Sequence, residues 1–67
     1  MRKFTAGEAK KLIGKEVKWR RKFSAISDKG IVLDVQGRNI QIDFHGMYDW
    51  LWLPDILIEE LETTQEA

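Results

Sequence analysis

The first apolar positions of the chain are spaced as they are on one face of a helix. Thr5 and Glu8 match the capping box, in which a Thr hydroxyl accepts a hydrogen bond from an early backbone N–H and the Glu side chain reaches back. Gly14 is a residue type that commonly follows the last turn of a helix. Three apolar residues between them lie at i, i+3 and i+4: Ala9, Leu12 and Ile13. The pattern predicts a helix over residues 6–13, with Phe4 as a hydrophobic staple.

After Gly14 the pattern changes to the alternation that is typical of strands. Residues 15–21 alternate charged side chains with Val17 and Trp19, which predicts a half-buried strand. Residues 22–29 are predicted to form a long loop. Further strands are predicted at 30–35, 40–44, 50–53 and 56–61. The side chains expected to face the core are Ile31, Leu33 and Val35, then Ile40, Ile42 and Phe44, then Leu51 and Leu53.

Short polar segments separate these strands. Residues 36–39 predict a tight turn, so that Val35 and Ile40 flank a hairpin. Residues 45–49 predict the next turn, and Pro54 predicts a 3₁₀ turn because proline cannot donate to a strand ladder. The whole pattern predicts a mainly β fold with a short N-terminal α-helix. Five strands in so short a chain favour a closed sheet, because little chain is left to cover open sheet edges.

Length and composition restrict the function classes. With 67 residues the chain is expected to form one domain over residues 1–61, followed by a frayed tail at 62–67. The absence of cysteine excludes disulfides, Cys-based zinc sites and a cysteine nucleophile. There is no apolar stretch of membrane-spanning or signal-peptide length, so we expect a cytoplasmic protein without membrane contact.

Charge is unevenly distributed although the formal net charge is zero. Residues 1–29 carry ten Lys or Arg against three Asp or Glu, and residues 30–67 carry one against eight. The two halves could be neighbours in the fold and neutralise each other, or the basic half could form a patch for an anionic partner.

Three short motifs resemble the SH3-like barrels, especially the Tudor and chromo-barrel branch: Gly-Ile-Val-Leu-Asp-Val at 30–35, Ile-Gln-Ile-Asp-Phe-His-Gly at 40–46 and Trp-Leu-Pro-Asp at 52–55. The resemblance covers about half the chain and implies a five-stranded SH3-like barrel. That branch often holds methylated lysine or arginine in an aromatic cage, which Phe44 and Trp52 would match. Met47 and Asp49 stand where chromo barrels carry tryptophan, so the cage pattern is incomplete.

A second resemblance points to an enzyme. The type II dihydrofolate reductases are SH3-like barrels of similar size that build one active pore from four subunits. The step that would match theirs is residues 50–54, and it lacks the Gln and Tyr that the resemblance requires. An oligomeric reductase is therefore a remote alternative.

Trp50 and Trp52 are the most informative pair of residues. Strand alternation places them on one face, opposite Leu51 and Leu53, and the SH3-like pattern turns the leucines inward. Two outward tryptophans are costly to leave in water. Either residues of the helix or of the 22–29 loop cover them, or they bind a second copy or a peptide. The predicted binding residues are Trp50, Trp52, Tyr48, Phe44, His45 and Phe23.

Basic residues interleaved with aromatic ones suggest a different interface. Trp19 and Phe23 alternate with cationic side chains, an arrangement that can contact phosphates and stack on bases. The alternative interpretation is a solvated strand edge that faces acidic neighbours. The nucleic-acid candidates are Lys18, Arg20, Arg21 and Lys22.

No arrangement of residues predicts catalysis. His45 is the only histidine, and no pattern places a serine or threonine near it. Glu59 and Glu60 are adjacent on a strand, so their side chains point to opposite faces. We therefore expect a non-enzymatic binding or assembly module without metal or cofactor. Its partner would be a protein or peptide, favoured if basic because acidic residues surround the tryptophans, or a second copy of the chain.

Overall fold

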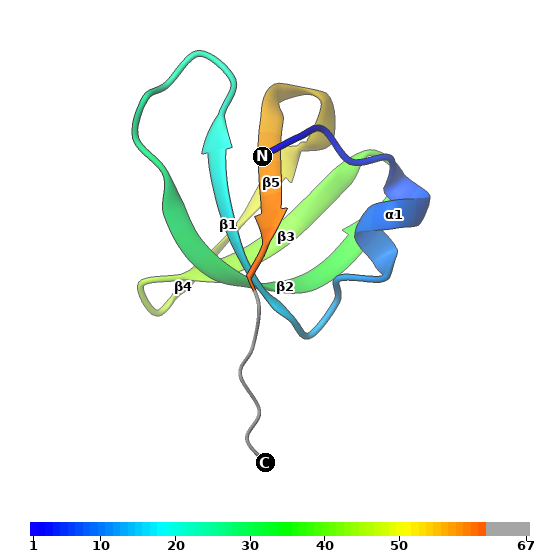
Figure 1. The fold of residues 1–67 in the computed structure, drawn as a ribbon. Helices are drawn as coiled ribbons and strands as arrows, with labels where there is room; N and C mark the ends of the chain where they lie inside the picture. The colour runs from blue at the N-terminus through cyan, green and yellow to red at the C-terminus, as the bar shows by residue number, and fades with distance from the viewer. Residues whose placement is uncertain (62–67) are drawn as a thin grey trace.

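A computed structural model describes residues 1–61 (Figure 1). The chain forms one short helix, five strands and one 3₁₀ turn: α1 (Ala6–Lys10), β1 (Glu16–Arg21), β2 (Asp28–Gln36), β3 (Asn39–Phe44), β4 (Met47–Trp52), η1 (Leu53–Asp55) and β5 (Ile56–Glu60). The predicted mainly β fold with an N-terminal helix is confirmed. The tail predicted at 62–67 lies outside the described residues.

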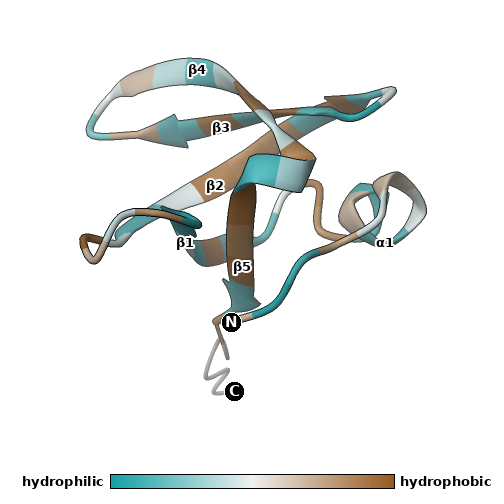
Figure 2. Ribbon diagram, turned by 90° about the horizontal axis from the view of Figure 1, so that it is seen from above, coloured by the Kyte–Doolittle hydropathy of each residue, from teal (hydrophilic) through white to brown (hydrophobic). Residues whose placement is uncertain are grey.

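All five strands belong to one antiparallel sheet with the order β4-β3-β2-β1-β5. The sheet is strongly bent, and β5 runs across the direction of β3 and β4 (Figure 2). Within residues 1–61, β4 and β5 end the sheet on its two sides and are not paired with each other. The strand pairing therefore shows an open five-stranded sheet, and the predicted closure is not established by it.

The capping box forms as the sequence predicts. The Glu8 N–H donates to Thr5 Oγ1 at 3.1 Å, and the Thr5 N–H donates to Glu8 Oε1 at 3.0 Å. That second bond, reinforced by the Arg2 guanidinium, lowers the pKa of Glu8 below its ordinary value. The helix ends earlier than predicted, because the chain turns toward the sheet and the Gly14 N–H donates to the Val32 carbonyl at 2.7 Å.

Two-residue turns join β2 to β3 and β3 to β4. The predicted turn at 36–39 is confirmed, with Gly37 at a φ of 59°. The second turn is shorter than the predicted 45–49, because His45 and Gly46 alone make the reversal, with φ values of 56° and 76°. These paired left-handed conformations suit a tight hairpin. Tyr48 and Asp49 therefore belong to β4 and not to a turn.

The core lies inside the bend of the sheet; α1 contributes Ala9 to it, and the turn after α1 contributes Leu12. The prediction that Ile31 and Leu33 face inward with Val35 is wrong, because Val32 is the buried residue and a β-bulge between Val32 and Asp34 shifts the alternation. Ile13, predicted on the apolar helix stripe, is also exposed. The buried strand and η1 residues are Val17, Trp19, Val32, Val35, Ile40, Ile42, Leu51, Leu53, Ile56 and Ile58.

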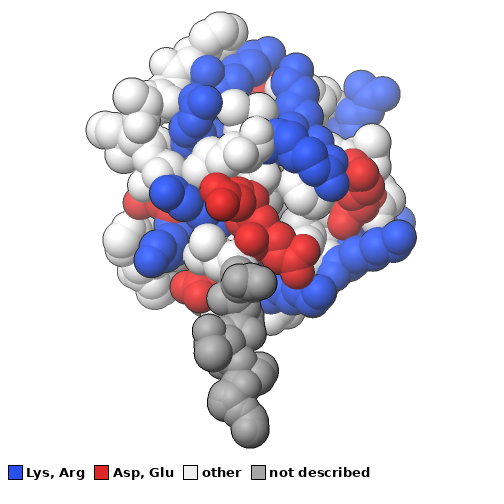
Figure 3. All heavy atoms as spheres, viewed as in Figure 1, with Lys and Arg blue, Asp and Glu red and all other residues white. Residues whose placement is uncertain are grey.

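The basic and acidic halves of the sequence meet in the fold. Lys15 Nζ lies 3.1 Å from Glu60 Oε2, and Lys22 Nζ lies 3.7 Å from Asp55 Oδ1. On the face shown in Figure 3, acidic side chains are surrounded by lysine and arginine. On that face the basic and acidic halves of the sequence are therefore neighbours that neutralise each other, the first of the two interpretations of the uneven charge. In the described part of the chain, no helix combines the length and apolar character that crossing a bilayer requires.

Candidate functional site: an aromatic row on an edge strand

Three aromatic side chains project from the same face of β4. Tyr48, Trp50 and Trp52 alternate with Asp49 and Leu51, and Leu51 is buried in the core. Trp50 and Trp52 remain 44% and 45% exposed, and Tyr48 remains 68% exposed. The prediction that the tryptophans face outward and the leucines inward is confirmed. We call Tyr48, Trp50 and Trp52 the aromatic row.

Polar and acidic residues flank the aromatic row on β3. Tyr48 lies opposite Asp43, Trp50 opposite Gln41, and Trp52 opposite Asn39. A hollow of about 330 Å³ beside the row is lined by Gln36, Asn39 and Trp50. Asn39 and Gln36 lie opposite each other on neighbouring strands. The row is therefore a set of large rings beside hydrogen-bonding side chains, a combination common where one protein binds another.

The acidic residues around the row are not engaged by basic ones. Asp34, Asp43 and Asp49 take part in no salt bridge with another described residue. The Asp34 carboxylate instead accepts hydrogen bonds from the Val35 N–H and the Gln36 side chain. β3 and β4 carry Asp43 and Asp49 and neither Lys nor Arg. A basic partner would find uncompensated negative charge here.

The backbone of the aromatic row faces the open edge of the sheet. The Leu53 N–H donates to the Arg38 carbonyl at 2.8 Å, which continues the β3–β4 ladder. Because bonded pairs alternate in an antiparallel ladder, the bonds to β3 come from the buried-face residues, and the N–H and C=O groups of the row point away from β3. The Trp50 N–H accordingly donates to the Asp49 carboxylate at 3.0 Å, not to a strand.

Two predicted site residues lie beside β4 without joining the row. Phe44 is half-buried on the opposite face and packs edge-on against Trp19, with ring centroids 5.2 Å apart. His45 forms the hairpin turn, and its Nε2 lies 3.3 Å from Asp28 Oδ1. An aromatic cage of Phe44 with Trp52 is therefore not formed, because strand alternation puts their side chains on opposite faces.

The loop between β1 and β2 lies away from β4 in Figures 1 and 2, and Phe23 is one of its residues. Its ring is 93% exposed, and Lys22 Nζ lies 5.2 Å from the ring centroid. Ile26 on the same loop is also exposed. The loop is thus a separate apolar surface with a cation beside it.

The basic residues predicted to contact nucleic acid differ in their surroundings: some bond to other parts of the fold and others are exposed. Trp19 is buried, which leaves Lys18 and Arg20 on the outer face of β1 as predicted. The Arg20 guanidinium donates to the Ser24 carbonyl at 2.9 Å and so holds the loop, and Lys18 lies opposite Glu59. Lys22 pairs with Asp55, whereas Arg21 is exposed.

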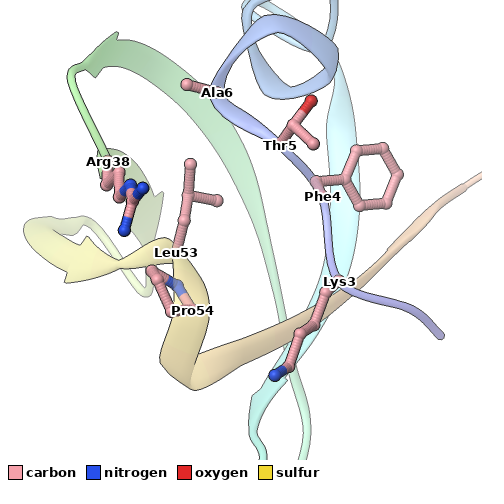
Figure 4. Close-up of a pocket in the computed structure, with 7 residues that line it drawn as sticks. All are labelled: Lys3, Phe4, Thr5, Ala6, Arg38, Leu53 and Pro54. Carbon is pink, nitrogen blue, oxygen red and sulfur yellow. The ribbon is translucent and has the colours of Figure 1, made fainter.

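No pattern in the sequence indicated the pocket of about 370 Å³ that lies at the C-terminal end of β4 (Figure 4). Its walls come from three segments distant in sequence: residues 3–6 before and at the start of α1, Arg38 in the β2–β3 turn, and Leu53 with Pro54 in η1. No local pattern connects these segments, because only the fold brings them together.

Comparison of the chain with known protein families, curated proteins and solved structures finds no match.

Proposed function

We propose that this protein is a non-enzymatic binding or assembly module of the SH3-like barrel type, and that it recognises a protein or peptide, or itself, through the aromatic row. The observation that carries the proposal is the exposure of three large rings on one face of an edge strand. Neither α1 nor the loop at 22–27 buries them. Buried aromatic anchors supply much of the binding energy of protein interfaces.

The order of the strands supports the SH3-like assignment. β1 lies between β2 and β5, consecutive strands β2, β3 and β4 follow as hairpins, and η1 introduces β5. α1 lies beside the bent sheet, and η1 connects β4 to β5 (Figure 1). The three sequence motifs fall on β2, β3 with its turn, and the β4–η1 junction.

Selection from a random-peptide library on the immobilised protein tests the proposal. We expect enriched peptides that combine apolar residues with Lys or Arg, because the row lies among unpaired carboxylates. Their affinity should fall at least tenfold for Trp50→Ala or Trp52→Ala, a loss typical of an interface anchor. Ile26→Ala, a truncation of another exposed apolar side chain, is the control and should leave affinity unchanged. Peptides that bind the two Trp variants as tightly as the wild type would contradict the proposal.

A second candidate function is nucleic-acid binding through the β1–β2 loop. The observation that favours it is the 93% exposure of Phe23 beside Lys22 and Arg21, since an exposed ring beside cations can stack on a base. Binding of a single-stranded oligonucleotide should weaken steeply as salt rises and should be lost in Phe23→Ala. Absence of binding at low salt would remove this candidate.

A further inference from the structure

One edge strand of the sheet, β5, is paired with a further segment of the chain, whereas the other edge strand, β4, is open. At the β5 edge, the Arg2 N–H donates to the Ile58 carbonyl at 3.1 Å, and the Ile58 N–H donates to the Arg2 carbonyl at 2.8 Å. The N-terminal segment therefore covers β5. No strand or segment of residues 1–61 pairs with β4 on its outer side, and Figure 2 shows β4 as the outermost ribbon there. An open edge strand is a template for pairing with another strand.

The free backbone groups of β4 have an arrangement that is complementary to itself. They belong to Tyr48, Trp50 and Trp52, which are spaced evenly about Trp50. If two β4 strands meet antiparallel about a two-fold axis at Trp50, each Trp50 lies opposite the other, and Tyr48 lies opposite Trp52 of the second copy. The Trp52 N–H of each copy then donates to the Tyr48 carbonyl of the other copy, whereas the Trp52 carbonyl already accepts the first hydrogen bond of η1. A shift by one residue would place groups that already bond β3 in the new ladder.

The side chains agree with the same register. Residues opposite each other in a sheet project to the same face, so the two aromatic rows would lie side by side as one patch of six rings. The net charge of the chain is zero, so two copies do not repel each other at long range, and the acidic residues of β3 and β4 weaken the contact at short range. We infer that β4 pairs antiparallel with β4 of a second copy, which joins two five-stranded sheets into one; this inference rests on the proposed binding role of the aromatic row.

The exposed area predicts that this dimer is weak. The three rings expose roughly 350 Å² per copy, judged from their exposed fractions and the size of aromatic side chains. Stable complexes bury about 800 Å² per partner. Asp49 also opposes pairing, because its carboxylate occupies the Trp50 N–H. We therefore expect reversible dimers that appear at high micromolar concentration.

Sedimentation velocity of the full chain from low micromolar to millimolar concentration tests the inference. Trp52→Pro removes the N–H that donates to the Tyr48 carbonyl of the second copy, whereas Trp52→Ala removes the ring and keeps that N–H; the φ of −87° at Trp52 lies near the value that proline fixes. Two hydrogen bonds, one per copy, separate these variants, so Trp52→Pro should dimerise about tenfold more weakly than Trp52→Ala. Circular dichroism checks that each variant is folded.

A second pair of variants tests the same pairing through a gain in the affinity of dimerisation. Asp49→Ala and Asp49→Asn both remove the negative charge, but the Asn side chain keeps an oxygen that can accept from the Trp50 N–H. Only Asp49→Ala frees that donor for the second copy. We expect Asp49→Ala to dimerise several-fold more tightly than Asp49→Asn, a result that holds even if Trp52→Pro does not fold.

The outcomes separate this inference from the proposed function. A protein that stays monomeric at millimolar concentration, in the wild type and in Asp49→Ala, overturns the β4 pairing and leaves peptide binding to its own test. A dimer that is lost in Trp50→Lys but does not distinguish Asp49→Ala from Asp49→Asn overturns edge pairing in favour of contact between ring faces. A dimer unaffected by all these changes forms through another surface, so it overturns the β4 pairing and also leaves peptide binding to its own test.

Discussion

Gly30 occupies a position in β2 where a side chain has no room. A Cβ at this position would lie 2.5 Å from Ile42 Cγ2 and 2.6 Å from the Asp43 carbonyl oxygen. The carbonyl belongs to the β3 backbone and cannot move without disturbing the ladder. We expect Gly30→Ala to lower the free energy of unfolding by about 2 kcal/mol, as overpacking of a core does. Urea denaturation measures the change.

Gly7→Ala is the matched control for that substitution. Gly7 lies in α1, and a Cβ there would meet only Thr5 Oγ1 at 4.0 Å. Alanine is favoured over glycine in a helix, so the control should be neutral or should stabilise by up to about 1 kcal/mol. Equal stability of Gly30→Ala and Gly7→Ala would show that β2 and β3 are not packed as described.

The lowered pKa of Glu8 predicts that part of the free energy of unfolding is lost in acid. Its pKa is lowered chiefly because its carboxylate accepts the Thr5 N–H, and next because Arg2 donates to it. A lowered pKa means that the fold favours the ionised form. The contribution is therefore present above the ordinary value of 4.5 and is lost as pH falls through the lower pKa of the folded state. Glu8→Gln should be less stable than the wild type at neutral pH, and the difference should shrink in strong acid. Urea unfolding curves that stay equally separated at both pH values would refute this assignment.

At the scale of the strand, the bulge in β2 decides which residues stabilise the core. Val32 is buried and Leu33 is 41% exposed, the reverse of what simple alternation from Val35 predicts. Val32→Ala should cost about 2 kcal/mol of unfolding free energy, as loss of a buried branched side chain does. Leu33→Ala should cost less than about 0.5 kcal/mol, as surface changes do. Thermal or urea unfolding compares them, and a larger loss for Leu33→Ala would place the bulge elsewhere.

The same bulge shows how far alternation along a strand can be used. Within β1, β3 and β4 no residue is inserted, so the buried residues Val17, Ile42 and Leu51 follow from the two-residue period alone. A bulge adds one residue to one strand, and its position depends on how two strands twist around each other. The short polar turn at 36–39 was predictable because its residue types favour reversal, whereas the end of α1 was set by a bond to β2.

At the scale of the whole molecule, the aromatic row was predictable and its surroundings were not. The outward direction of Trp50 and Trp52 follows from the inward direction of Leu51 and Leu53. Whether another segment covers them depends on where α1 and the 22–27 loop end up, which no local pattern encodes. The same holds for the mixing of charge, because Lys15 meets Glu60 only through the pairing of β1 with β5.

Arg2 connects the edge of the sheet to the rest of the molecule. Its backbone pairs with Ile58, its guanidinium lies 3.2 Å from Glu8, and its Cζ lies 4.0 Å from the centroid of the Phe4 ring. Arg2→Ala keeps the backbone pairing and removes exposed side-chain contacts, so it should cost at most about 1 kcal/mol. Arg2→Pro also removes the N–H that bonds Ile58, so it should cost more and loosen the cover on β5.

Arg2→Ala and Arg2→Pro should also differ in the number of copies that assemble. A chain with one open edge can pair only once, so β4 pairing ends at a dimer, whereas a chain with two open edges can continue into larger assemblies. We expect sedimentation velocity at millimolar concentration to show species larger than a dimer for Arg2→Pro and none for Arg2→Ala. If Arg2→Pro has the size distribution of the wild type, the N-terminal segment does not protect β5, and the limit to two copies must come from elsewhere in the fold.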